Sequence, residues 1–208
     1  METNWAAEHL QTIRTLMERS ALYRRALAPI MTFTGVLGTA GAVVAIVSHV
    51  ETSQAFVLFW ATVGLLSLAG SFLLVRRQAL KESEAFWSPP TRRVAQAMIP
   101  PFLVGAVAGL PAALGLRWEL VPLWGLPMLW MLLYGCALSA AGFFMVRAVK
   151  YLGWVFLVCG CAMLAAPAVF SGPPSLARCN EIMGGVFGGL HLLGGIYLYF
   201  TEKGKNAA

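Results

Sequence analysis

Long apolar stretches without charge dominate this chain and limit what it can fold into. An α-helix needs about 20 residues to cross roughly 30 Å of hydrocarbon at about 1.5 Å per residue. Inside hydrocarbon, backbone N–H and C=O groups must bond to one another, and a helix achieves this within its own segment. We therefore expect about six transmembrane helices, and we place them near residues 28–50, 55–75, 99–116, 122–145, 151–170 and 183–200.

The composition agrees with a lipid solvent. Hydrophobic residues make up 59% of the chain and charged residues only 12%, whereas soluble domains average about 45–50% and about 25%. The net charge of +6 comes from basic residues at the edges of the apolar stretches, and no nucleic-acid-binding motif accompanies them. We predict anionic lipid headgroups, and no nucleic acid, as their partner.

The distribution of cations predicts an orientation. Lys and Arg are enriched in cytoplasmic loops because of the membrane potential and the anionic inner leaflet. If the N-terminus is cytoplasmic, only Arg117 and Arg178 lie outside. We therefore predict a location in the bacterial inner (plasma) membrane, with both ends in the cytoplasm and these cations on that side: Arg14, Arg19, Arg24, Arg25, Arg76, Arg77, Lys81, Arg92, Arg93, Arg147, Lys150, Lys203 and Lys205.

Residues 1–27 have a different pattern from the spans. Asn4 can cap a helix whose apolar residues recur at spacings of three and four, with charged residues elsewhere around it. This predicts an amphipathic helix on the cytoplasmic membrane surface; a solvated helix and a partner-docking helix are the alternatives. The predicted organisation is therefore this helix, a six-span domain at 28–200 with a cytoplasmic loop at 76–98, and a cytoplasmic tail at 201–208.

A weak repeat divides the predicted spans into three helical hairpins. The segment Tyr23-Arg24-Arg25 before the first span is echoed by Thr91-Arg92-Arg93 before the third, and Arg147 and Lys150 precede the fifth. Selection for cations on the cytoplasmic side would produce much of this pattern without duplication. The origin of the repeat therefore stays open.

The cytoplasmic loop 76–98 holds a candidate contact surface. Its centre, Phe86-Trp87-Ser88-Pro89-Pro90, cannot continue a helix because proline lacks the N–H and restricts the preceding residue. We expect Thr91 to cap a short basic helix that ends near Met98. The loop is either an ordinary connection or a site where Phe86, Trp87, Arg92 and Arg93 contact a cytoplasmic protein.

Glycine pairs predict where helices pack closely. In lipid, helix association depends on small residues that let two backbones approach. The pairs Gly105/Gly109, Gly184/Gly188 and Gly185/Gly189 each have the GxxxG spacing. We expect them to form seams within the bundle or between two copies of it, and the sequence does not separate these cases.

His191 is the most notable polar residue inside a predicted span. An ionisable group at this depth is a functional-site hypothesis by default. Either it contacts a proton or a ligand, or it is a neutral imidazole bonded to a hydroxyl such as that of Ser67, Ser71 or Ser139. Because no predicted span contains a carboxylate, a proton relay lacks its second member, and we favour the structural alternative.

Polar residues also gather in the predicted external loops. They could converge into a polar mouth over the bundle, or they could be loop residues in water whose ion pairs contribute at most about 1 kcal/mol. The candidates are His49, Glu51, Arg117, Glu119, Arg178, Asn180 and Glu181.

No residue pattern predicts catalysis, a metal site or a cofactor. The sequence contains no HExxH, GxSxG, P-loop or dinucleotide motif and no Asp. Cys159 and Cys161 point about 200° apart on one helix, so they cannot bind one ion together. We therefore expect no enzyme. We predict a membrane-embedded interaction or sensor component; the alternative is a small transporter or channel for a neutral or hydrophobic solute.

Overall fold

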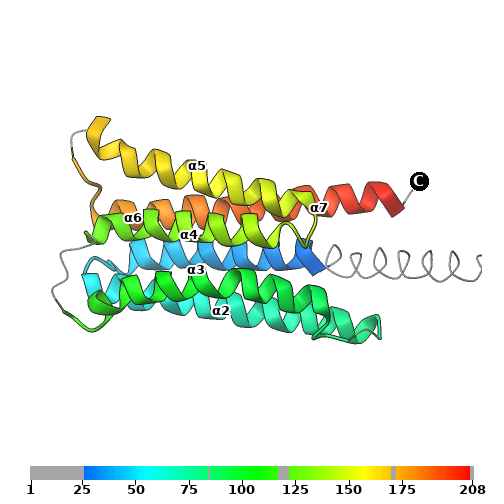
Figure 1. Ribbon diagram of the computed structural model, residues 1–208. Helices are drawn as coiled ribbons and strands as arrows, with labels where there is room; N and C mark the ends of the chain where they lie inside the picture. The colour runs from blue at the N-terminus through cyan, green and yellow to red at the C-terminus, as the bar shows by residue number, and fades with distance from the viewer. Residues whose placement is uncertain (1–25, 84, 117–121, 170–171, 207–208) are drawn as a thin grey trace, which may run out of the picture.

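The computed structural model describes residues 26–83, 85–116, 122–169 and 172–206. All regular structure in these ranges is helical, and six helices are long and apolar enough to cross a membrane. The helices lie side by side in an elongated bundle, and consecutive spans run in opposite directions (Figure 1). The predicted surface helix within residues 1–27 falls outside the described residues except for its last two positions.

The first helix, Ala26–Val47, and α2, Ser53–Lys81, form one antiparallel pair. The third span is α3, Pro89–Ala113. A 3₁₀ turn at Leu123–Gly125 leads into α4, Leu126–Ala141, which is followed by α5, Arg147–Val169. The last span combines α6, Leu176–Ile182, a π-helical segment, Met183–Gly188, and α7, Gly189–Asn206.

The third span begins about ten residues earlier than expected. Ser88, not Thr91, is the N-cap, and Pro89 and Pro90 occupy the first helical turn. Proline suits this position because the missing N–H would have no partner within the helix. The prolines thus start the helix, and the basic segment after them belongs to the span. The expected loop 76–98 shortens accordingly to the residues between Lys81 and Pro89.

The last span also begins before its expected start at residue 183. The side chain of Ser175 accepts a hydrogen bond from the Arg178 N–H at 3.3 Å and caps α6. Cys179 and Asn180, expected in a loop, therefore lie on a helix and are fully buried. The polar character of these residues suggested a loop. The prediction was wrong because a capped helix can present polar residues to a partner helix.

Other boundaries also differ from the expected ones, among them the connection between α4 and α5. α4 ends at Ala141 and not at 145, because the chain turns at Gly142. A Cβ at Gly142 would lie 2.7 Å from the Cβ of Lys150, so glycine allows α5 to begin immediately beside the end of α4. α5 accordingly starts at Arg147 and not at 151.

The core consists of two clusters of buried hydrophobic side chains. One joins the first helix to α4, α5 and α7 through Leu27, Met31, Met131, Leu138, Val149, Phe156 and Leu198. The other joins the first helix to α2, α4 and α6 through Ala42, Phe56, Val57, Trp60, Leu126, Cys179 and Met183. The first helix and α4 contribute to both clusters, and together they connect the two ends of the bundle.

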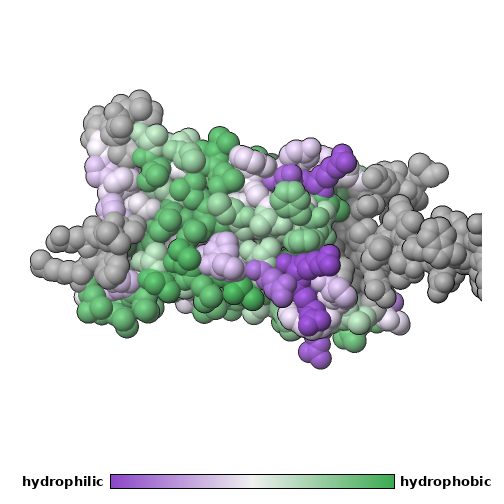
Figure 2. Space-filling model, in the orientation of Figure 1, coloured by the Kyte–Doolittle hydropathy of each residue, from purple (hydrophilic) through white to green (hydrophobic). Residues whose placement is uncertain are grey.

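The outer surface of the bundle is apolar over most of its length. Large hydrophobic side chains are exposed on every long helix except α4, including Val47, Leu65, Leu103, Val158 and Leu193. Figure 2 shows hydrophobic residues covering much of one side, while hydrophilic residues gather toward the end where α3 and α5 begin. An exposed apolar surface of this extent fits lipid better than water.

Glycines bring the last span into contact with the first helix. A Cβ at Gly188 would lie 2.6 Å from the backbone N of Thr39, and one at Gly35 would lie 2.5 Å from the backbone N of Leu192. The Cβ of Ala42 occupies the space beside Gly184. The Gly184/Gly188 pair therefore packs within the chain.

The other predicted glycine pairs differ from one another. Gly105 and Gly109 pack against Trp130 of α4, and Gly109 also contacts Val57 of α2. A Cβ at Gly185 or at Gly189 would meet no atom within 4 Å. The Gly185/Gly189 pair therefore has no packing role within the described part of the chain.

A pair of alanine substitutions tests the seam. Gly188→Ala should lower the unfolding free energy by about 1–3 kcal/mol, because the backbone of the first helix must move away from the new methyl group. Gly185→Ala should leave stability unchanged or raise it slightly, since alanine favours the helix. Thermal unfolding of the two purified variants in detergent measures the difference, and equal stabilities would contradict the packing.

Candidate functional site

His191 of α7 lies in the interior of the bundle with both ring nitrogens hydrogen-bonded. Its side chain is 3% exposed. Nδ1 lies 2.6 Å from the carbonyl O of Phe187, and Nε2 lies 2.7 Å from the hydroxyl of Tyr134 on α4. Because a carbonyl only accepts, Nδ1–H is the donor and Nε2 accepts from the tyrosine O–H. A neutral imidazole therefore satisfies both bonds.

Aromatic rings surround this pair. The ring centroid of Phe156 on α5 lies 5.5 Å from that of His191 and 4.9 Å from that of Tyr134. Phe187 contacts both Tyr134 and Phe156, and Phe102 of α3 stacks on Tyr134 at 6.1 Å. Five helical segments thus meet at one polar pair in an apolar setting, where the hydrogen bond fixes how the last span faces α4.

The hydroxyl partner of His191 is not one of the serines expected from the sequence. Ser71 Oγ donates to the carbonyl of Ser67 on its own helix, and Ser139 Oγ has no hydrogen-bond partner among the described residues. Sequence reasoning missed Tyr134. The available signal was a tyrosine inside an apolar span, since a buried phenol O–H needs an acceptor.

A double-mutant cycle measures this bond. Tyr134→Phe and His191→Phe should each destabilise the protein, and the coupling energy between them should be about 0.6 kcal/mol and at most about 1.7 kcal/mol, the range for hydrogen bonds between membrane helices. Unfolding in mixed detergent micelles gives the four free energies. Additive effects would show that the two side chains do not interact.

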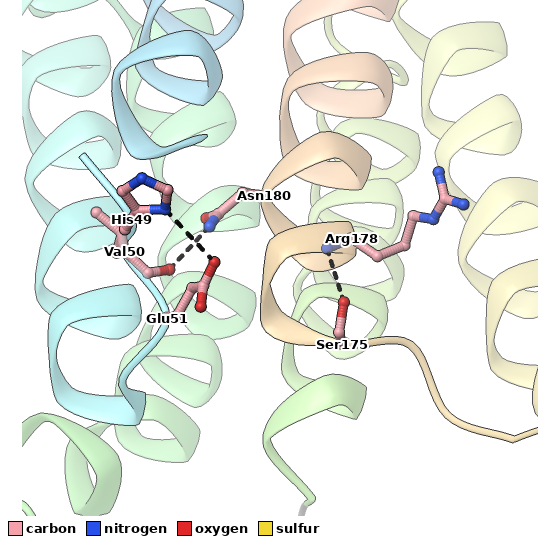
Figure 3. Close-up of polar contacts among 6 residues, drawn as sticks. All are labelled: His49, Val50, Glu51, Ser175, Arg178 and Asn180. Carbon is pink, nitrogen blue, oxygen red and sulfur yellow. Dashed lines mark hydrogen bonds and ion pairs between the residues drawn. The ribbon is translucent and has the colours of Figure 1, made fainter. Parts of the chain in front are cut away.

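A second buried polar residue, Asn180 of α6, joins three parts of the bundle. Its side chain is 0% exposed. Its Oδ1 accepts from Trp60 Nε1 of α2 at 2.8 Å. Its Nδ2 donates to the carbonyl of Val50 at 2.9 Å, and Figure 3 shows this second bond. The amide thereby holds the last span against α2 and against the connection that follows the first helix.

The other described residues of the predicted polar mouth do not converge on Asn180. His49 and Glu51 form a pair at 3.9 Å, and Arg178 and Glu181 form another at 2.6 Å, all with exposed side chains. Figure 3 shows Arg178 pointing away from Asn180. Arg117 and Glu119 lie outside the described residues. The described members are thus one surface ion pair, one exposed contact between His49 and Glu51, and one buried amide.

Neighbouring residues on α6 offer a matched test. Asn180→Leu should lower the unfolding free energy by about 1–3 kcal/mol, because Trp60 N–H and the Val50 carbonyl lose their partner. Glu181→Gln removes only an exposed ion pair and should change it by less than about 1 kcal/mol. Thermal unfolding with tryptophan emission as the probe compares them, and a tolerated leucine would contradict the role of the amide.

Two of the predicted contact residues, Phe86 and Trp87, pack against neighbouring groups just before α3. The ring of Phe86 packs edge-on against Phe72 of α2 at 4.8 Å, and Trp87 stacks on Phe86 at 6.2 Å. Thr91 Oγ1 donates to the Phe86 carbonyl at 2.9 Å. Trp87 remains 58% exposed. The segment just before α3 therefore presents one large aromatic side chain at its surface.

The two arginines that follow are also exposed, and Arg93 contacts a second connection. Its guanidinium carbon lies 5.8 Å from the ring centroid of Phe144, and Lys150 Nζ lies 4.3 Å from that of Phe143. Sequence reasoning did not single out Phe143 and Phe144. Two consecutive phenylalanines beside a basic helix start were the signal that could have identified them.

Comparison of the chain with protein families, curated proteins and solved structures finds no match. Its function is therefore argued from the geometry alone.

Proposed function

We propose that this protein resides in a bacterial inner membrane with both ends of the chain in the cytoplasm. Six apolar helices and an apolar outer surface support the membrane location. The orientation is supported by the charges at the two ends. Arg178 at one end pairs with Glu181, whereas the described cations at the other end include Arg76, Arg77, Lys81, Arg92, Arg93, Arg147 and Lys150. Such an excess marks the cytoplasmic side.

We further propose that it serves as an interaction or sensor component that binds a protein at this basic end. The observation that carries the proposal is Trp87, which is exposed, stacks on Phe86 and is followed by Arg92 and Arg93. Tryptophan and arginine are enriched among the residues that dominate binding energy at protein interfaces. A side chain already held in place also loses less entropy on binding.

The packing of the spans favours this function over transport of a neutral solute. His191 and Asn180, the buried polar residues of the bundle interior, both bond to other groups of the chain. The first helix and the last span meet at backbone distance along their glycines. A pathway for a solute needs space between the helices, so this close contact supports a closed bundle.

Site-specific photo-cross-linking in cells tests the proposal. A photoreactive amino acid at Trp87 should give a discrete protein adduct, and the adduct should fall several-fold when Arg92 and Arg93 are both changed to Glu. The same amino acid at Leu114, exposed at the opposite end of α3, is the control and should give no such adduct.

Identical adducts at both positions, or adducts with lipid alone at Trp87, would overturn the docking role. The second result would identify Trp87 as an interfacial membrane anchor. Reporter fusions after Ala208 and at Pro173 test the orientation separately. A reporter active only outside the cytoplasm should be silent after Ala208 and active at Pro173.

A further inference from the structure

Two cations on different helices stand over two adjacent phenylalanine rings at the basic end. Arg93 belongs to α3 and Lys150 to α5, while Phe143 and Phe144 lie on the connection from α4 to α5. Phe143 is 72% exposed. Neither cation has an ion-pair partner among the described residues. The cation–π contacts therefore hold two positive charges in place. No carboxylate among the described residues neutralises them.

The start of α5 adds to the positive field. Arg147 and Lys150 lie in or next to its first turn, which contains no acidic residue. The N-terminus of a helix already carries partial positive charge and unpaired N–H groups. Cations at this position repel the partial charge unless an anion lies nearby. An anionic ligand would therefore stabilise the N-terminal end of α5.

An apolar surface begins directly beneath these cations. α4 runs between α3 and α5 (Figure 1). Leu133 of α4 lies beside Gly105 of α3, and Leu132 lies beside Gly160 of α5. The face of α4 that lies between these two leucines therefore points outward from the bundle. Helical spacing places Cys136 and Ala140 on this face. Cys136 is exposed, as expected for this face.

This outward face of α4 leads toward Phe143. On α5, Trp154 and Val155 are exposed about one turn beyond Lys150 and continue the apolar surface. A soluble anion would leave all of these side chains uncovered. A ligand that joins a phosphate to a hydrocarbon chain would match the cations and the apolar surface together.

We propose that this surface binds one anionic phospholipid, with its phosphate at Arg93 and Lys150 and an acyl chain along the outward face of α4. The inference rests on the membrane location proposed above and does not depend on a protein partner at Trp87. It assigns the Phe143–Phe144 connection to lipid recognition and the Phe86–Trp87 connection to protein recognition.

Lipid binding by the purified full-length chain tests the site. Native mass spectrometry of the delipidated protein in detergent should show phosphatidylglycerol binding far more tightly than phosphatidylcholine with the same acyl chains. The double variant Arg93→Gln/Lys150→Gln should raise the dissociation constant for phosphatidylglycerol about thirtyfold, as expected for two cations near an anionic surface.

The double variant Arg76→Gln/Arg77→Gln on α2 is the matched control, since it removes the same charge at the same end and should change binding little. Equal losses in both variants would overturn the site in favour of general attraction. Displacement of the lipid by inorganic phosphate would show that a soluble anion is the ligand and would also overturn it. If the first double variant does not fold, Arg93→Gln and Lys150→Gln are measured singly, and two unchanged dissociation constants refute the proposal. Arg93 belongs to both proposed surfaces, whereas Lys150 belongs to the lipid site alone. Lys150→Gln by itself therefore separates a failure of the lipid site from a failure of protein binding at Trp87.

Discussion

The contact between the first helix and the last span is the constraint on which the rest of the bundle depends. Gly35, Gly38, Gly184 and Gly188 let the two backbones meet without intervening side chains. In lipid, where helices gain little from hiding apolar surface from one another, such an approach supplies dispersion contacts that larger residues would block. It joins the two ends of the sequence and holds the last span where its polar side chains reach α4 and α2.

The two buried polar residues then define the orientation of that span. His191 bonds to Tyr134 in the half of the bundle near the basic end, and Asn180 bonds to Trp60 and Val50 near the other end. Because both side chains have hydrogen-bond partners in other parts of the chain, they specify one packing of the helix. The recognition surfaces proposed for protein and lipid accordingly lie outside the core, on connections at the basic end.

Much of the fold followed from the sequence, and the starts of the third and last spans were wrong for one shared reason. The all-helical class and the six long apolar helices are confirmed, while membrane insertion stays a prediction. The boundaries failed at Ser88 and Ser175, where a local cap extended a helix into residues whose prolines or polar groups suggested a loop. Hydropathy measures which residues prefer lipid. The start of a helix depends instead on its first N–H groups, which either need an acceptor from a capping residue or are absent because the residue is proline.

The candidate sites were less predictable because their partners are distant in sequence. His191 and Tyr134 are separated by 57 positions, and Asn180 and Trp60 by 120. The spacing of Gly184/Gly188 equals that of Gly185/Gly189, yet only the first pair meets another helix. By itself the sequence determined the helices, their apolar character and the basic end, since these depend on local backbone bonding and side-chain transfer energies. Only the tertiary structure decided which face of each helix meets which neighbour, because that choice depends on how all six helices fit together.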